Sequence, residues 1–181
     1  FELLSKPFIL FSFIGIMCHV GIDVGTNTTA PKILMNKLGI TLVQAGFASS
    51  LYFVFRIIGS LLGSLILKKI SSREFFILST TLMSISLLFL PWLGSKLSIY
   101  ICIALIGFGN ANIFPLIYSK IILTLPDKQN EVSGLMTMAL FGGAIFPLFM
   151  GFASDMGGQN FAITIMAVGA IYLSLYSIKI K

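Results

Sequence analysis

Six long runs of apolar residues, separated by short polar or charged connections, make up most of the chain. They lie at about residues 7–27, 44–67, 75–94, 98–122, 132–154 and 160–178. A helix needs about 20 residues to cross a hydrocarbon core of about 30 Å, and each run supplies about that number. A membrane barrel would instead need strands in which apolar and polar positions alternate. The pattern therefore predicts an all-α integral membrane protein, with residues 1–181 forming one bundle of six transmembrane helices.

Composition agrees with this prediction. Of the 181 residues, 57% are hydrophobic and 10% are charged, and the mean hydropathy is +1.02. A soluble domain carries about 25% charged residues. The net charge is +6, but the Lys and Arg residues lie mostly in short connections, where they orient the chain rather than bind nucleic acid. Cys18 and Cys102 lie inside apolar runs, which indicates small hydrophobic side chains rather than a disulfide or a metal site.

The basic residues are divided unevenly between the two sides of the predicted bundle. Three lie on one side, Lys32, Lys37 and Lys96, and Arg56 lies inside the second run. Eight share the opposite side: Lys6, Lys68, Lys69, Arg73, Lys120, Lys128, Lys179 and Lys181. Because cytoplasmic loops are enriched in Lys and Arg, we expect both ends of this segment in the cytoplasm. The chain begins without Met, a basic leader region or a cleavage site, which predicts a fragment of a longer protein that lacks a signal peptide.

The two halves of the chain resemble each other weakly at a fixed offset. The offset is 88 residues and pairs identical residue types: Gly46 with Gly134, Phe53 with Phe141, Ile57 with Ile145, Gly63 with Gly151, and Gly21 with Gly109. Because a shift of three helices reverses orientation in the membrane, this predicts two inverted three-helix repeats. The first and fourth helices, each polar and glycine-bearing, take corresponding places, as do the second and fifth, and interrupted helices at matching positions would mark the binding site. Chance similarity among helices of like composition is the alternative.

The first helix carries a polar stripe. His19, Asp23 and Asn27 recur every four residues and so share one face. Asp23 lies about 24 Å from the cytoplasmic start of the helix, at about 1.5 Å per residue, and counting along the second helix places Arg56 at nearly the same depth. Charges at that depth indicate function, either proton coupling or an intramembrane ion pair. A fixed structural pair is the alternative, and for His19 the alternative is a hydrogen-bonded core histidine.

The fourth helix contains the stretch from Gly107 to Tyr118, where two glycines, two asparagines and a proline interrupt an apolar run. Proline frees a backbone carbonyl about one turn earlier, and an asparagine in hydrocarbon needs partners. Amides beside aromatic rings suit sugars, because hydroxyls need hydrogen bonds while the apolar ring face packs on aromatics. Ordinary packing of a kinked helix is the alternative. We expect the following residues to line a substrate cavity: Asn27, Asn110, Asn112, Phe114, Tyr118 and Phe141.

The other helices carry weaker signals. Gly59 and Gly63 of the second helix have the spacing that supports close helix contact. The third helix, residues 75–94, has only Ser and Thr as polar residues, so we expect it at the periphery. The sixth, residues 160–178, is expected to be lipid-facing scaffold.

An enzyme is not expected. His19 is the only histidine, no serine has a glycine two residues before it, and only Asp23 is an acid placed well at membrane depth. These observations argue against intramembrane serine and aspartyl proteases, and no cluster of His, Cys or carboxylates suggests a metal cofactor. A non-transporting scaffold or a channel subunit is the alternative to transport, although neither a ring of charges nor a carbonyl-rich filter is visible.

Three stretches resemble one known family: VGIDVG at 20–25, GFGNANIFPLIYS at 107–119, and SGLMTMALFGGAIFPLFMGFASD at 133–155. They resemble the carboxyl-terminal half of a major facilitator superfamily sugar porter, nearest the fucose permease and glucose/galactose transporter branch. The resemblance covers essentially the whole chain. It implies a twelve-helix fold in which these helices are the seventh to the twelfth.

The resemblance also implies a function. It implies secondary active transport of a hexose or deoxyhexose, such as fucose, glucose or galactose, by proton symport and alternating access in a bacterial inner membrane. The implied partners are the sugar, protons, the lipid bilayer and an N-terminal six-helix half, and no cofactor is implied. Two features depart from the family pattern. The family usually has Glu where Asp23 stands, and its loop motif after the second helix is reduced here to Gly63, Leu67 and Lys68, so a gating latch based on Asp is not expected.

Overall fold

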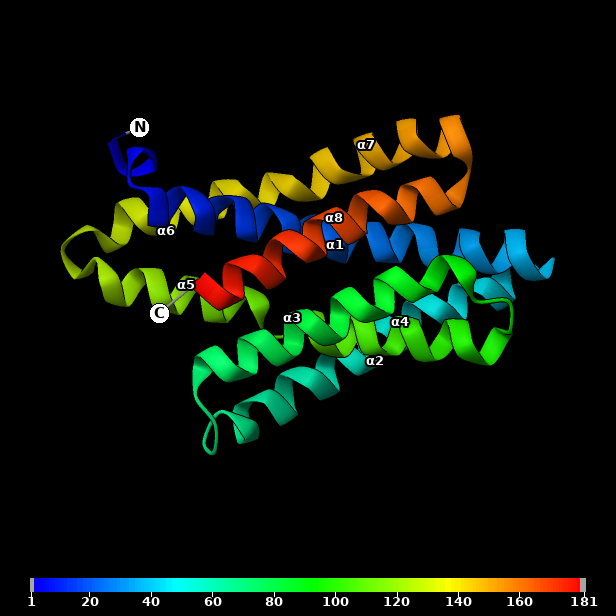
Figure 1. The fold of residues 1–181 in the computed structure, drawn as a ribbon, viewed down its shortest axis with the longest axis horizontal. Coiled ribbons are helices and arrows are strands. Elements are labelled where there is room, and N and C mark those ends of the chain that lie inside the picture. Colours follow the sequence, from blue (N-terminus) through cyan, green and yellow to red (C-terminus); the bar gives the residue numbers. More distant parts are fainter. Residues whose placement is uncertain (1, 180–181) are drawn as a thin grey trace.

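The computed structural model describes residues 2–179, which fold entirely into helices and their connections (Figure 1). Lys181, predicted on the cytoplasmic side, lies outside the described residues. The α-helices are α1 (Pro7–Leu38), α2 (Leu42–Ile66), α3 (Ser72–Phe89), α4 (Lys96–Asn110), α5 (Ile113–Thr124), α6 (Gln129–Met138), α7 (Gly142–Gly157) and α8 (Gln159–Lys179). Short 3-10 turns are η1 (Glu2–Ser5), η2 (Leu90–Trp92), η3 (Pro126–Lys128) and η4 (Ala139–Phe141).

Six helical spans in the described chain are long and apolar enough to cross a membrane, as predicted. They cover Pro7–Leu38, Leu42–Ile66, Ser72–Trp92, Lys96–Thr124, Pro126–Gly157 and Gln159–Lys179. The fourth span joins α4 to α5, and the fifth joins η3, α6, η4 and α7. The predicted all-α membrane fold is therefore confirmed.

The first helix is longer than predicted. It continues past the predicted end near Asn27 to Leu38, where Gly39 closes it with a φ of 63° and donates its N–H to the Met35 carbonyl. Pro31 lies inside the helix and, having no N–H, leaves the Asn27 carbonyl without its usual partner. The hydroxyl of Ser49 on α2 donates to that carbonyl at 3.2 Å. The helix continues because a neighbouring helix replaces the missing hydrogen bond.

The fourth span is interrupted, whereas the first is not. The break at Ala111 and Asn112 separates α4 from α5, four residues before Pro115, whose missing N–H cannot bind the Ala111 carbonyl. Between Pro7 and Pro31 the first helix has no proline and stays continuous. The two corresponding helices therefore differ, since the fourth is interrupted and the first is continuous.

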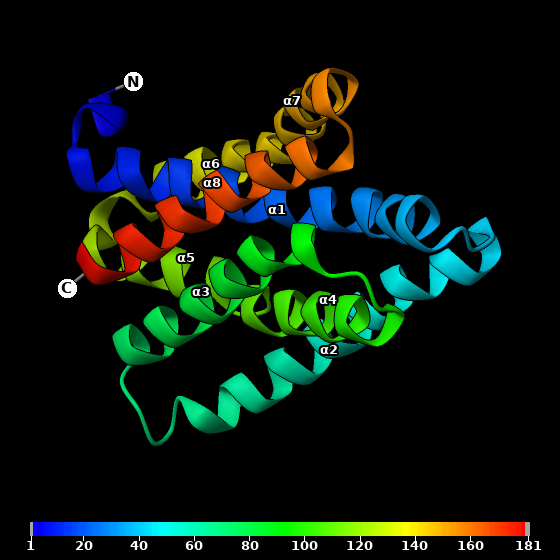
Figure 2. The same ribbon diagram turned by 45° about the vertical axis from the view of Figure 1, so that its right-hand side comes forward.

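Helices of one half of the chain pack on the central helix of the other half. The helix α2 of the first half packs on α4 of the second, and α7 of the second half packs on α1 of the first. Likewise α3 packs on α4 as α8 packs on α1, and α3 and α8 pack on each other. Figures 1 and 2 show α1 and α4 crossing the middle of the bundle. Such an exchange of partners is what two three-helix repeats produce.

The third and sixth spans, expected at the periphery and facing lipid, each have one well-buried face. Half of the apolar window of each is buried, the same share as in α1, against 17% for α2 and 22% for the fifth span. Their hydroxyl side chains meet across the α3–α8 contact: Ser84 and Ser174 lie 2.9 Å apart, and Thr80 donates to Ser177 at 3.3 Å. Small polar side chains let helices approach closely and bond to each other in lipid, which is why a Ser- and Thr-bearing helix packs inward.

One end of the bundle collects both chain ends and the α2–α3 and α5–α6 connections, in both views (Figures 1 and 2). The predicted cytoplasmic cations of the described residues lie on these segments. At this end Arg73 donates to the Ile178 carbonyl at 2.7 Å. At the opposite end Lys37 donates to the carbonyls of Leu90, Pro91 and Leu93. The two sets of cations are thus separated as the sequence predicts.

Candidate functional site

Asp23 and Arg56 form an ion pair halfway along their helices. Asp23 lies sixteen residues after the start of α1 and fifteen before its end. Nη1 of Arg56 on α2 lies 2.6 Å from Oδ2 of Asp23 and 2.8 Å from Oδ1. The side chains are 18% exposed for Asp23 and 30% for Arg56. The structure thus brings together the two charges that the sequence places at similar depth.

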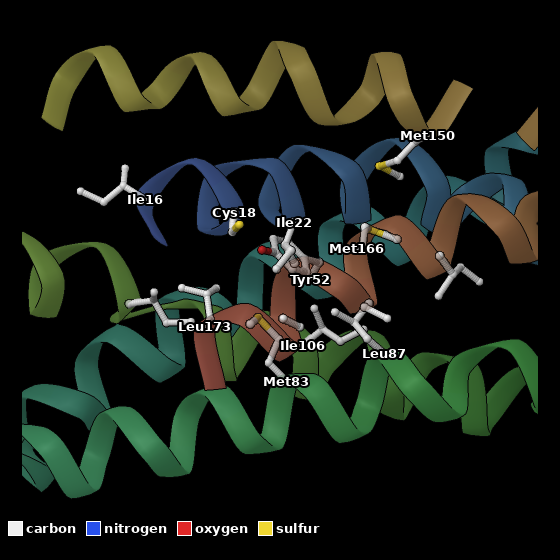
Figure 3. Close-up of a cluster of buried hydrophobic side chains, with 14 of the residues drawn as sticks. Ile16, Cys18, Ile22, Tyr52, Met83, Leu87, Ile106, Met150, Met166 and Leu173 are labelled. Carbon is white, nitrogen blue, oxygen red and sulfur yellow. The ribbon is translucent and has the colours of Figure 1, made fainter. Parts of the chain in front are cut away.

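Tyr52 joins this pair to the fourth span. Its hydroxyl donates to Oδ1 of Asp23 at 2.6 Å and accepts a hydrogen bond from Nδ2 of Asn110 at 2.9 Å. The side chain is fully buried and belongs to the buried hydrophobic cluster drawn in Figure 3. The sequence analysis did not select Tyr52 as a site residue. The available signal was its position one helical turn before Arg56, which puts both on one face of α2.

His19 completes the arrangement from the first helix. Its Nδ1 lies 2.8 Å from Oδ1 of Asn110, and because an amide oxygen only accepts, Nδ1 carries the proton in this assignment. His19 is 2% exposed and Asn110 is fully buried. Arg56, Asp23, Tyr52, Asn110 and His19 therefore form a continuous series of hydrogen bonds across α2, α1 and α4, which we call the buried polar network.

An aromatic pair continues from this network. The ring of Phe114 lies 6.3 Å from that of His19, centroid to centroid, and stacks on Tyr118 at 5.6 Å with an interplanar angle of 15°. Tyr118 donates its hydroxyl to Ser133 of α6 at 2.8 Å. Polar and aromatic side chains thus run from α2 to α6. The break at Ala111 separates Asn110 from Phe114 along the chain, but His19 lies beside both.

Two glycines allow α2 and α4 to approach closely enough for this contact. A Cβ atom on Gly59 would lie 2.7 Å from the Phe108 carbonyl oxygen, and one on Gly107 would lie 2.5 Å from that of Tyr52. Each glycine therefore faces the backbone of the other helix. This contact holds Tyr52 against the end of α4, where Asn110 donates a hydrogen bond to its hydroxyl.

Three predicted site residues lie apart from the buried polar network. Asn112 is 7% exposed and donates to the Gly59 carbonyl at 2.8 Å, so its amide binds the backbone of α2. Phe141 lies on η4 and is 67% exposed. Asn27 donates to the backbone carbonyl of Asp23 at 2.9 Å.

The side-chain oxygen of Asn27 differs from the other polar atoms of the region. Within residues 2–179, Oδ1 of Asn27 is the one buried side-chain nitrogen or oxygen that has no hydrogen-bond partner. A buried acceptor without a partner is costly, so a donor that reached it would be bound favourably. It lies one helical turn beyond Asp23 on the same face of α1.

The site offers hydrogen bonds, one ion pair and aromatic surface. The described residues contain no group of three or more His, Cys, Asp or Glu side chains that could hold a metal ion. The amide of Asn110 uses one N–H and one lone pair in the network, so it keeps capacity for one further donor and one further acceptor contact. The arrangement can offer hydrogen bonds and aromatic surface to a polar molecule.

Comparison with known proteins gives a family match and several relatives. The model of the Major Facilitator Superfamily matches residues 12–179. A putative glucose/galactose transporter of Helicobacter pylori is 28% identical over 156 residues, which are 86% of this chain and 38% of the relative. A glucose/galactose transporter of Brucella abortus is 23% identical over 167 residues, which are 91% of this chain and 40% of the relative. The chain therefore spans about two-fifths of the length of the curated relatives it matches.

Solved structures show the same fold. The crystal structure of the transporter FucP in the outward conformation matches with a TM-score of 0.91 at 19% identity, covering all of this chain and 45% of FucP. A second structure, of the Escherichia coli fucose:proton symporter FucP, matches with a TM-score of 0.92 at 19% identity, over 99% of this chain and 44% of FucP.

Proposed function

Since the chain belongs to the Major Facilitator Superfamily, we propose that it forms one six-helix half of a secondary transporter for a hexose or deoxyhexose, driven by proton symport. The observation that carries the proposal is the buried polar network halfway along the first and fourth spans, with the aromatic pair beside it. In transporters built from repeats, substrate and coupling sites lie near the bilayer midplane. The relatives named as glucose/galactose transporters and the fold of a fucose:proton symporter support this substrate class.

The proposed sugar site uses the amide of Asn110, the rings of Phe114 and Tyr118, and the open acceptor of Asn27. A sugar has hydroxyls that need convergent hydrogen bonds and an apolar ring face that packs on aromatics. Phe114 and Tyr118 are stacked nearly parallel, so their edges form one apolar wall. Phe141 faces away from the packed interior and would close the site from the fifth span.

The proposed coupling group is Asp23. As a carboxylate it binds both Arg56 and the Tyr52 hydroxyl. Protonation would remove its charge and release Arg56, so the network could switch between two arrangements. Asn110 accepts from His19 and donates to Tyr52. Tyr52 also binds Asp23, so a change at Asp23 would be passed through Tyr52 to Asn110 in the proposed sugar site. The rival role is a static ion pair that only holds α1 and α2 together.

The proposed working unit contains an N-terminal six-helix half in addition to this chain. The exposed apolar side chains of α2 include Phe53, Ile57 and Leu61, and those of α7 include Leu148 and Phe152. The second and fifth spans, which contain α2 and α7, have the smallest buried shares of the six spans in the described chain. Alternating access needs one half to move against the other. The proposed location is a bacterial inner membrane with both ends of this segment in the cytoplasm.

The proposal is tested by reconstituting the full-length protein in proteoliposomes and following radiolabelled fucose, glucose and galactose. We expect saturable uptake of at least one sugar, with accumulation only when the imposed pH gradient is inward for protons. Uptake that does not saturate would favour a channel subunit, and absence of uptake of all three sugars in correctly folded protein would favour a non-transporting scaffold. Either result contradicts the proposal.

A further inference from the structure

Two neighbouring hollows lie between α1 and α8 on the surface of the bundle. The first, of about 220 Å³, is lined by Phe8, Phe11, Tyr172, Leu175, Tyr176 and Lys179. The second, of about 380 Å³, lies deeper along the same helices, with Ile14 and Cys18 of α1, Ile145 and Phe149 of α7, and Val168 of α8 among its walls. Tyr172 lines both hollows.

The two hollows follow one another along α1 and α8, with Tyr172 between them. Their lining residues on α1 follow each other at 8, 11, 14 and 18, and those on α8 at 179, 175, 172 and 168. Residues three or four apart lie on one face of a helix, so each helix presents a single stripe. The helices run in opposite directions, and the two hollows therefore extend from the chain ends toward the middle of the bundle, with α7 beside the deeper one (Figure 1). We call the two hollows together the α1–α8 groove.

The walls of the α1–α8 groove are apolar except at its mouth. The two tyrosine hydroxyls are already engaged with α1: that of Tyr172 donates to the Phe11 carbonyl at 2.8 Å, and that of Tyr176 lies 2.6 Å from the Ser12 hydroxyl. Their rings stack with an interplanar angle of 1° and present only ring surface. The one charged side chain in the lining is Lys179, which is exposed in the last turn of α8.

The length of the groove matches one leaflet of a bilayer. Eleven residues separate Val168 from Lys179, which at about 1.5 Å per residue is about 16 Å. Half of a hydrocarbon core is about 15 Å. A cation at one end of an apolar channel of this length is complementary to a phospholipid, with its phosphate at the surface and its acyl chain along the helices.

We propose that the α1–α8 groove binds a phospholipid, with one acyl chain lying between α1, α7 and α8 and the phosphate held by Lys179. The site takes a different class of ligand from the proposed sugar site and lies on the outer side of the same helix α1. An anionic headgroup is preferred, because Lys179 meets it at the end of the bundle where the described cations Lys6 and Arg73 also lie.

Native mass spectrometry of the purified full-length protein tests the proposal. The protein is stripped of lipid and offered dioleoylphosphatidylglycerol or dioleoylphosphatidylcholine. We expect the anionic lipid to be retained about fivefold better, as one lysine near a membrane surface provides. Lys179→Gln should remove this preference, and Lys96→Gln, at the opposite end of the bundle, should leave it unchanged.

Filling the groove tests the acyl-chain half of the proposal. Val168 is 61% exposed, so Val168→Trp occupies the groove without entering the core. It should lower retention of both lipids about fourfold or more, the effect of displacing one buried methylene. Leu78→Trp on α3, where Leu78 is 59% exposed, is the matched control and should have no effect. Retention that is unchanged in Val168→Trp overturns the proposal. So does the absence of retained lipid in the unsubstituted protein, the result expected if another part of the protein covers the groove.

Discussion

The hydroxyl of Tyr52 donates a 2.6 Å hydrogen bond to Oδ1 of Asp23, the same oxygen that Arg56 approaches at 2.8 Å. A buried phenol thus shares a carboxylate with a guanidinium. Oδ1 of Asp23 therefore accepts from two donors, and both donors belong to α2. The same phenol oxygen accepts from Asn110, so a single atom connects the charged pair to the fourth span.

Tyr52→Phe should uncouple the pair from the fourth span while keeping the ring. The substitution leaves Nδ2 of Asn110 buried without its partner, which costs about 1 to 3 kcal/mol. We expect a lower thermal unfolding temperature in detergent and a smaller proton-driven accumulation of sugar. Tyr100→Phe is the control, because the ring contacts of Tyr100 with Phe47 and Lys96 do not need its hydroxyl. Equal accumulation in Tyr52→Phe and the unsubstituted protein would remove Tyr52 from the coupling route.

Asp23→Asn separates the two roles proposed for the ion pair. As a coupling group, Asp23 is needed for transport against a gradient but not for exchange, so the variant should lose pH-driven accumulation and keep counterflow. As a static partner of Arg56, its loss leaves a partly buried cation unpaired and should lower the yield of folded protein. The double variant with Arg56→Gln should then restore the yield. Normal accumulation together with a normal yield of folded Asp23→Asn would contradict both roles.

Asn110 and Asn112 should behave differently, although they are two residues apart. Asn110→Ala removes an amide of the network that keeps free bonding capacity, so sugar affinity should fall by about 1 to 3 kcal/mol, or about fivefold to 150-fold. Asn112→Ala removes the bond to the Gly59 carbonyl, so protein stability should fall more than affinity. The comparison needs the dissociation constant and the melting temperature of each variant. A lower sugar affinity with an unchanged melting temperature in Asn112→Ala would instead indicate that Asn112 binds the sugar.

Gly59→Ala should separate α2 from α4. The added Cβ would lie 2.7 Å from the Phe108 carbonyl oxygen, a distance at which one backbone must move. We expect a marked loss of folded protein, measured by size-exclusion chromatography after membrane extraction. Gly46→Ala on the same helix is the matched control, since its Cβ would meet nothing within 4 Å. Similar yields for the two variants would mean that the glycine contact does not limit the packing of these helices.

The sequence was sufficient to predict the spans and the meeting of Asp23 with Arg56, because depth along a transmembrane helix follows from counting residues at about 1.5 Å each. It did not identify Tyr52, because a tyrosine in an apolar run has the same pattern whether its hydroxyl is bonded or not. The length of α1 was also missed. The helix continues past Pro31 because Ser49 of another helix donates a hydrogen bond to the Asn27 carbonyl. The local sequence of one helix does not predict such a contact with another helix.

The partner of Asn112 could not be predicted from the sequence either. An amide in an apolar helix signals that it needs partners, but the partner can be a ligand or a backbone carbonyl. Asn110 ends α4, whereas Asn112 lies in the break before α5. The Asn110 side chain meets His19 and Tyr52, and the Asn112 side chain meets Gly59. Composition alone does not distinguish the two environments.

The continuous helix α1 also links Asp23, in the middle of the bundle, to the end where α3 connects to α4. Its 32 residues measure about 48 Å, more than the hydrocarbon core of about 30 Å, so one or both of its ends stand outside the core. Lys37 lies fourteen residues beyond Asp23 and is bound to three carbonyls after α3. A tilt of about 5° centred on Asp23 would displace Lys37 by about 2 Å over that arm of about 21 Å. A small change at one carboxylate would therefore shift the α3–α4 connection at that end of the bundle.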